Sequence, residues 1–149
     1  MKKRLFLALS LVLLLSCLAQ AKQFAVVSDK QNTTGNVKAV DLASLLSGKT
    51  KAWVDGRPVR IVLRDPTLPD MEFVFRRVLN MTPNQVRALM QAHPGLIVIA
   101  DTDDAVLRFV AATRGALGIV DLYSLTKDVA VIKIDGKLPF DPGYLLKAD

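Results

Sequence analysis

Hydrophobic and polar residues recur along the chain with two different periods, which predict strands and helices in turn. Short apolar runs predict strands, and apolar residues recurring every three or four positions predict helices. The predicted strands cover residues 24–29, 59–64, 96–100, 116–121 and 129–136, and the predicted helices cover residues 37–47, 71–80, 81–92 and 103–114. This order, β-α-β-α-α-β-α-β-β, predicts one α/β domain of three layers. Its sheet is expected to be mixed and mostly parallel, with about five strands and helices on both faces.

The ends of two helices carry clear local signals. Thr82, Pro83 and Gln85 form the sequence of a capping box, which predicts that a helix begins there. Thr102 predicts a second helix start, and Gly115 predicts where that helix ends. These signals predict helix boundaries without any knowledge of the tertiary contacts.

Two further segments carry predictions about burial. The unbroken apolar run of residues 96–100 is typical of a strand covered on both faces. The tail, residues 137–149, is rich in Pro and Gly and is expected to run over the surface. Trp53 is expected in the core, because a lone aromatic side chain is more often buried than used as a ligand platform.

The first residues have the pattern of an export signal. A basic head, MKKR, precedes an apolar run over residues 5–16, and the small-x-small sequence AQA ends at Ala21. We therefore predict a cleaved signal peptide over residues 1–21, a folded domain over residues 22–149, and a periplasmic or other extracytoplasmic location. Cys17 leaves an alternative open, in which the protein is a lipoprotein anchored at that cysteine.

Composition excludes several function classes. The formal net charge of the 149 residues is +6, and it falls to +3 when the three basic residues of the predicted signal are removed. A mildly basic exported domain needs no nucleic-acid partner.

Removal of the signal also removes the only cysteine, and His93 is the only histidine. We expect no metal, no cofactor and no enzyme activity, because neither a zinc site nor a nucleophile–base pair has the residues it needs. The run DTDD, residues 101–104, lacks the spacing of a calcium loop.

Three segments resemble a known family. These are VDLASLLSGKTKAWVDGRPVRIVLRD (residues 40–65), TDDAVLRFVAATRGALGIVD (102–121) and VAVIKIDGKLPFDPGYLLK (129–147). In this order they are similar to the phosphate-binding, substrate-binding proteins of bacterial ABC transporters, which have the type II periplasmic-binding-protein fold. The resemblance implies a short member with a single lobe, since the complete family proteins have two lobes and close on the ligand between them. It also implies phosphate or another oxyanion as the ligand, and a membrane transporter as a partner.

The resemblance points to one candidate ligand site, at Arg64 and Thr67. In the family, an arginine that follows a strand precedes a Ser-Gly-Thr turn at the start of a helix. Arg64 matches that arginine, and Thr67 offers a hydroxyl group, but Pro69, Asp70 and Met71 stand roughly where the turn would be. Proline has no N–H to donate, and an acidic side chain competes with an anion for the helix end.

Two interpretations of Arg64 remain open: an oxyanion ligand, or a side chain paired with Asp65 or Asp70. They lead to two functional hypotheses. The first is an exported, non-enzymatic module that resembles the phosphate-binding component of ABC importers, has a degenerate phosphate site, and acts by binding a protein partner such as a membrane sensor or transporter. The second is a genuine phosphate or oxyanion solute-binding protein, complete as a homodimer or with a separate partner lobe.

Overall fold

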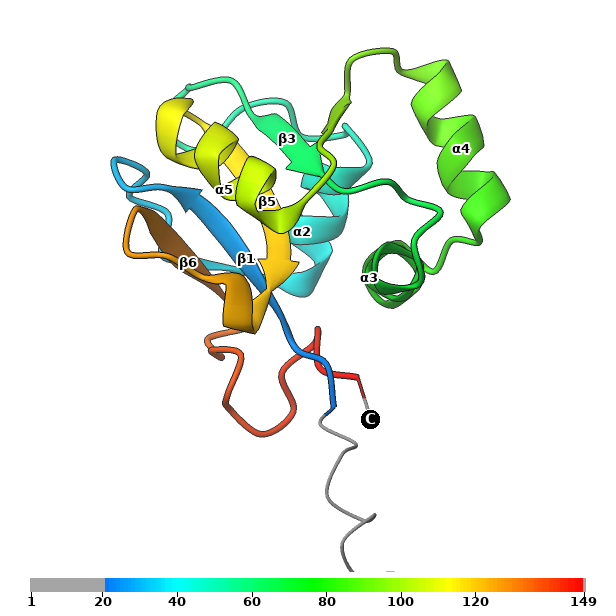
Figure 1. Cartoon of the computed structure of the whole chain (residues 1–149). Coiled ribbons are helices and arrows are strands. Elements are labelled where there is room, and N and C mark those ends of the chain that lie inside the picture. Colours follow the sequence, from blue (N-terminus) through cyan, green and yellow to red (C-terminus); the bar gives the residue numbers. More distant parts are fainter. Residues whose placement is uncertain (1–20, 149) are drawn as a thin grey trace, which may run out of the picture.

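In the computed structural model, which describes residues 21–148, a twisted sheet is enclosed by helices (Figure 1). The strands are β1 (Phe24–Asp29), β2 (Asn36–Val37), β3 (Arg60–Leu63), β4 (Ile97–Ile99), β5 (Ala116–Asp121) and β6 (Val129–Ile134). The helices are α2 (Ala39–Leu46), α3 (Pro69–Leu79), α4 (Pro83–Ala92) and α5 (Asp103–Ala112), with a short 3-10 helix, η2 (Leu122–Ser124). The predicted signal peptide, except for Ala21, and Cys17 lie outside the described residues.

The sheet has six strands in the order β2-β6-β1-β5-β3-β4. β1 runs antiparallel to both of its neighbours, β5 and β6. The other three pairs, β2 with β6, β3 with β4, and β3 with β5, are parallel. The mixed, mostly parallel α/β sheet is therefore confirmed. β2 was not predicted, because two residues in a polar segment have no detectable period.

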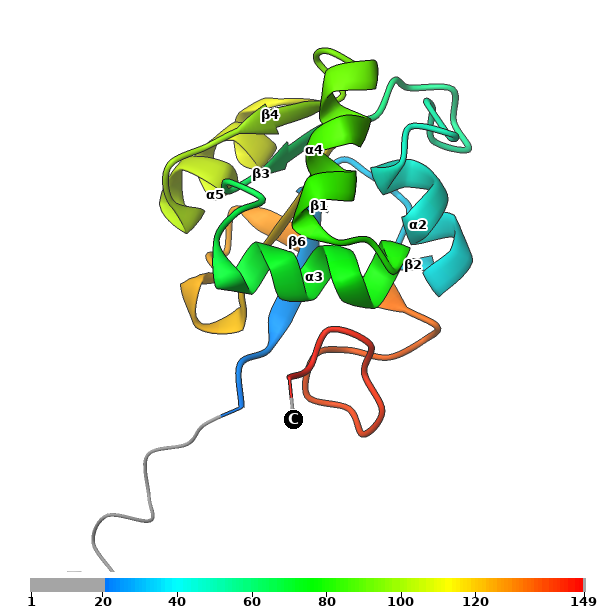
Figure 2. The ribbon, with the colours of Figure 1, turned by 90° about the vertical axis from the view of Figure 1, so that its right-hand side faces the viewer.

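Helices cover both faces of this sheet, as the three-layer prediction requires. α5 lies against one face and α2 and α3 lie against the other (Figures 1 and 2). Alternate residues of β1 serve the two layers, since Val26 packs with the α2 and α3 side chains while Val27 packs with those of α5. All six residues of β1 are buried, the polar Ser28 and Asp29 included, which explains why its sequence does not alternate between apolar and polar residues.

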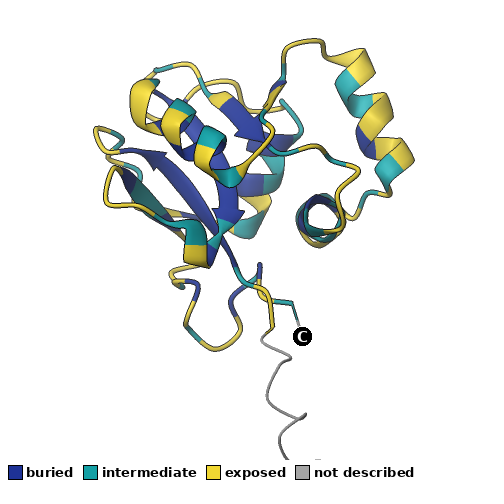
Figure 3. Cartoon of the chain, in the orientation of Figure 1, coloured by how far each residue is buried: buried dark blue, intermediate teal, exposed yellow. Residues whose placement is uncertain are grey.

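Helix α4 stands apart from this packing. Val86 is its only fully buried residue, and most of its surface is exposed (Figure 3). Its start nevertheless follows the sequence prediction, because the Gln85 N–H donates to Thr82 Oγ1 at 3.3 Å and the Thr82 N–H donates to Gln85 Oε1 at 2.8 Å. The capping box therefore sets the start of α4, although little of the helix packs against the core.

Two predictions about burial are corrected. β4 was expected to be covered on both faces, but it is an edge strand in which the exposed fractions of Val98 and Ile99 are 42% and 44%. The tail was expected to run over the surface, but Tyr144 and Leu146 are buried. The Leu146 carbonyl accepts a hydrogen bond from the Phe24 N–H at 2.9 Å, which ties the tail to the start of β1.

Trp53 is in the core, as predicted. It has 6% of its surface exposed, and its indole Nε1–H donates to the Gly115 carbonyl at 3.0 Å. Among the described residues, no helix is long and apolar enough to cross a membrane.

Candidate functional site

Arg64 lies at the carboxyl end of β3, where two helices begin. Its position is fixed because the preceding residue, Leu63, is fully buried and anchors the end of β3 against the core. The Arg64 side chain is 18% exposed and contacts Asp70, the second residue of α3, and Asp103, the first residue of α5. The amino ends of α3 and α5 therefore converge on one guanidinium group, and Figure 2 shows the start of α3 on the same side of the molecule as α5.

Two carboxylates occupy the space around this guanidinium. Arg64 Nη2 donates to Asp70 Oδ2 at 3.0 Å. Arg64 Nε lies 2.8 Å from Asp103 Oδ1 as an ion pair, but the Nε–H does not align for a hydrogen bond. Lys22 Nζ also donates to Asp70, at 2.9 Å. We call Lys22, Arg64, Asp70 and Asp103 the Arg64 cluster.

The electrostatics of Asp70 follow from these contacts. Burial by itself would raise the pKa of the Asp70 carboxyl. Hydrogen bonds from Lys22 and Arg64 outweigh that effect, so the pKa lies below its usual value. Asp70 therefore stays ionised at neutral pH, and its charge faces Arg64 where an external anion would compete with it.

Asp103 is held from its other side as well. Its Oδ2 accepts hydrogen bonds from the Asp121 N–H at 3.1 Å and from Ser124 Oγ at 3.0 Å. The carboxylate thus links the start of α5 to the end of β5 and to η2. Such a position is consistent with a structural role for Asp103 in addition to its ion pair with Arg64.

The structure separates the two residues that were predicted to form the site. Arg64 is in the Arg64 cluster, whereas the exposed Thr67 turns back on its own loop. Its N–H and Oγ1 both donate to Asp65 Oδ1, at 2.8 and 2.7 Å. These two bonds lower the pKa of the Asp65 carboxyl, the backbone bond contributing more. Among the described contacts, none joins Thr67 to Arg64.

The sequence identified one of the two Arg64 partners. Pairing with Asp70 was one of the alternatives, and the structure has this pair. Asp65, the other alternative, serves Thr67 instead. Asp103 was missed, because an acidic residue in the first turn of a helix is ordinarily a complement to the helix dipole. No local sequence signal distinguishes an acid that complements the helix dipole from one that also pairs with a distant arginine.

The first turn of α3 offers little to an anion. Its N-cap residue, Leu68, supplies no side-chain hydrogen bond, and Pro69 occupies the first helical position. Asp70 and Glu72 place negative charge in that turn. Arg76, in the last turn of α3, pairs with Glu72 at 2.7 Å. Within residues 21–148, no group of three His, Cys, Asp or Glu side chains lies where it would hold a metal ion.

Comparison with known proteins gives a consistent result for the fold. No protein-family model and no curated protein matches the chain by sequence. Solved structures do match it. A phosphate ABC transporter substrate-binding protein from Clostridium perfringens, solved with bound phosphate, superposes with a TM-score of 0.68 at 16% identity, over 80% of this chain and 47% of that one.

Two more structures agree. An ABC-type phosphate transport receptor from Vibrio cholerae gives a TM-score of 0.73 at 13% identity, over 86% of this chain and 54% of the receptor. PstS from Borrelia burgdorferi gives 0.70 at 14% identity, over 87% of this chain and 55% of that protein. The chain thus spans about half the length of these proteins. The resemblance indicated by the sequence is therefore confirmed at the level of fold: the chain folds like about half of a substrate-binding protein of the phosphate ABC transporters.

Proposed function

We propose that the protein is an exported, non-enzymatic binding module of the phosphate-binding-protein type, in which the protein's own carboxylates have taken the place of the anion. The observation that carries this proposal is the pairing of Arg64 with both Asp70 and Asp103. An incoming oxyanion would have to displace at least one of them, and like charges about 4 Å apart repel by about 1–4 kcal/mol. A hydrogen bond from a charged donor contributes about 1.5–3 kcal/mol, which does not clearly exceed that cost.

We propose further that the module acts through a protein partner, such as a membrane transporter or sensor. Two exposed apolar side chains beside the Arg64 cluster support this idea. Leu68 is 36% exposed at the start of α3, and Tyr123 is 71% exposed in η2, next to the Ser124 that binds Asp103. Tyrosine is enriched among the residues that contribute most to binding at protein interfaces.

The alternative function is a genuine phosphate or oxyanion solute-binding protein, as a homodimer or with a partner lobe. One observation favours it. The buried Arg64 Nε–H has no aligned hydrogen-bond acceptor among the described residues. A donor of this kind at the meeting point of two helix amino ends has the chemistry to receive an anion. The alternative therefore requires that a bound anion and the two aspartates share one arginine.

Thermal unfolding with and without phosphate separates the two functions. The comparison is made between the wild-type protein and Arg64→Ala, because phosphate also stabilises proteins nonspecifically, and that effect is common to both. We expect phosphate to raise the melting temperatures of both proteins equally. A true ligand present at one hundred times its dissociation constant would stabilise the wild type alone by about 2.7 kcal/mol. A stabilisation that disappears in Arg64→Ala would establish the alternative.

Crosslinking tests the partner. A photoreactive amino acid is placed at Tyr123, and as a matched control at Arg114, which is exposed beyond the other end of α5. We expect a discrete adduct with a membrane-associated protein from position 123 and none from position 114. An adduct between two copies of the chain, with a dimeric mass by light scattering, would favour the homodimer instead. Equal labelling from both positions would contradict a docking surface beside the Arg64 cluster.

A further inference from the structure

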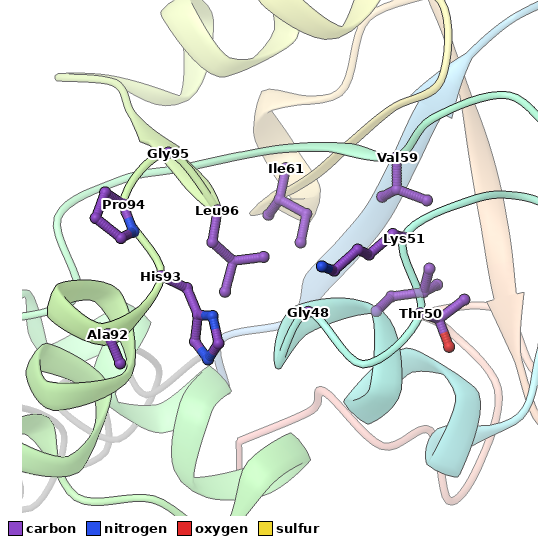
Figure 4. Close-up of a pocket in the computed structure, with 11 residues that line it drawn as sticks. Gly48, Thr50, Lys51, Val59, Ile61, Ala92, His93, Pro94, Gly95 and Leu96 are labelled. Atoms are coloured by element: carbon purple, nitrogen blue, oxygen red, sulfur yellow. The ribbon is translucent and has the colours of Figure 1, made fainter.

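A hollow lies at the opposite end of β3 from the Arg64 cluster. It has a volume of about 460 Å³ and lies at the amino ends of β3 and β4, between the carboxyl ends of α2 and α4 (Figure 4). Beside it, α4 is only loosely attached to the core: Val86 near its start is fully buried, and Met90 near its end is partly buried. Arg64 lies at the opposite end of β3, so the two sites are separate.

The hollow is lined by both apolar and polar groups. Leu45 and Ile61 have only 4% and 2% of their surfaces exposed, and Leu96 is half-buried. Lys51 and His93 are exposed at the rim, and none of the 11 lining residues is acidic. Its volume is within the range of small-molecule sites, about 300–1,000 Å³, and its polar side chains converge on a floor of apolar ones.

Lys51 and His93 face the hollow from opposite walls. In Figure 4 the Lys51 ammonium group points inward from the loop after α2, and the His93 ring projects from the end of α4. Among the described contacts, neither side chain has a hydrogen-bond or ion-pair partner. Their polar groups are therefore available to a ligand.

Capping of the adjacent helix ends does not account for the position of the Lys51 side chain. One carbonyl group near the end of each helix accepts a backbone N–H group. Leu45 O accepts from Gly48 at 3.1 Å, and Leu89 O accepts from His93 at 3.0 Å. Lys51 makes no hydrogen bond to either, so its charge is not consumed in capping a helix.

We propose that this hollow binds a small amphipathic anion. Its carboxylate or phosphate head would lie between Lys51 and His93, and its short apolar body would lie on Leu45, Ile61 and Leu96. The ammonium group and the ring N–H are both donors to an oxyanion, and none of the lining side chains is acidic.

The test is a titration of the purified protein with hexanoate, followed by backbone amide NMR shifts and by calorimetry. We expect saturable binding, with the largest shifts at residues 48–51 and 93–96. Lys51→Ala and His93→Ala are each expected to weaken binding about tenfold, the loss of one charge-assisted hydrogen bond. Lys49→Ala is the matched control, because Lys49 is exposed on the same loop but does not line the hollow.

Further probes distinguish the sources of affinity. Hexyl phosphate should bind by the same residues, and the ratio of its affinity to that of hexanoate identifies the preferred head group. Hexanol and inorganic phosphate, each with half of the required chemistry, should bind much more weakly. Ala92→Trp, which fills the hollow without a change of charge, should abolish hexanoate binding while the folded NMR spectrum is retained.

Three results would overturn the proposal: no saturable binding at millimolar hexanoate, equal losses in Lys51→Ala and Lys49→Ala, or binding that survives Ala92→Trp. Arg64→Ala should leave hexanoate binding unchanged, so this test and the phosphate test of the Arg64 cluster fail or succeed independently.

Discussion

At the scale of single residues, the Arg64 cluster holds together three separate elements by ion pairs. Asp70 and Asp103 come from different helices, and both are drawn to the one guanidinium at the end of β3. Their side chains are only 19% and 13% exposed, so solvent screens these pairs less than pairs at the surface. Each partner also has a second contact, which keeps the carboxylates in place.

The contribution of Asp70 to stability is expected to depend on pH. The pKa of Asp70 is lowered in the folded protein, so its contribution is present in full above the ordinary carboxyl pKa of about 3.9. It is lost as the pH falls through the lowered value. Asp70→Asn should therefore reduce the free energy of unfolding by about 1 kcal/mol at pH 7, and by progressively less below pH of about 4. Urea unfolding across this range measures the difference.

Glu72→Gln is the matched control for this prediction. Glu72 is another acid in the first turn of α3, but its pair with Arg76 is exposed, and an i,i+4 pair contributes only about 0.2–0.5 kcal/mol. Equal losses in Asp70→Asn and Glu72→Gln would mean that the helix dipole, and not the Arg64 cluster, accounts for the effect.

At the scale of elements, glycine decides how α5 is joined to β5. Gly115 has φ of +78°, and a Cβ atom there would lie 2.2 Å from the Pro58 carbonyl oxygen. The Gly115 N–H donates to Asp29 Oδ2 at 2.9 Å, and its carbonyl accepts from Trp53. Gly115 thus lies in the turn between α5 and β5 and bonds to two side chains that are distant in sequence.

Gly115→Ala is expected to destabilise the protein far more than the same change at Gly56. Gly56 has φ of +85° but nothing within 4 Å of an added Cβ, so Gly56→Ala has only the left-handed cost of about 1–2 kcal/mol. Gly115→Ala adds a backbone clash that cannot relax in a side chain, and a loss of at least about 3 kcal/mol is expected. Thermal and urea unfolding of the two variants provide the comparison. Similar losses at both positions would show that Pro58 moves freely.

At the scale of the whole molecule, the two ends of the described chain are joined beside β1. The Phe24 N–H donates to the Leu146 carbonyl and the Ala148 N–H donates to the Lys22 carbonyl, at 2.9 and 2.8 Å. The Leu146 side chain is fully buried in the same core cluster as Phe24. The tail therefore closes the α2 and α3 side of the core near the start of β1.

Leu146→Ala should lower the free energy of unfolding by about 2–5 kcal/mol, as expected for a buried leucine. Phe140→Ala is the control from the same tail, because Phe140 is 72% exposed, and its change should remain within about 0.5 kcal/mol. Urea unfolding measures both. A small effect of Leu146→Ala would contradict the burial of the tail and favour the surface position that its Pro and Gly content predicted.

The sequence by itself determined what depends on near neighbours along the chain. The capping box at Thr82, the helix start at Thr102 and the five main strands follow from local hydrogen bonding and from the period of apolar residues. The pairing of Arg64 with Asp70 was within reach because six residues separate them.

Only the tertiary structure decided the rest. An apolar run does not say whether its strand will be central or at an edge, so the exposure of β4 depends on strand order. The burial of Leu146 and the meeting of Arg64 with Asp103 likewise depend on which elements pack together. Long-range packing brings these groups together, and residues far apart in sequence carry no local pattern that records such a contact.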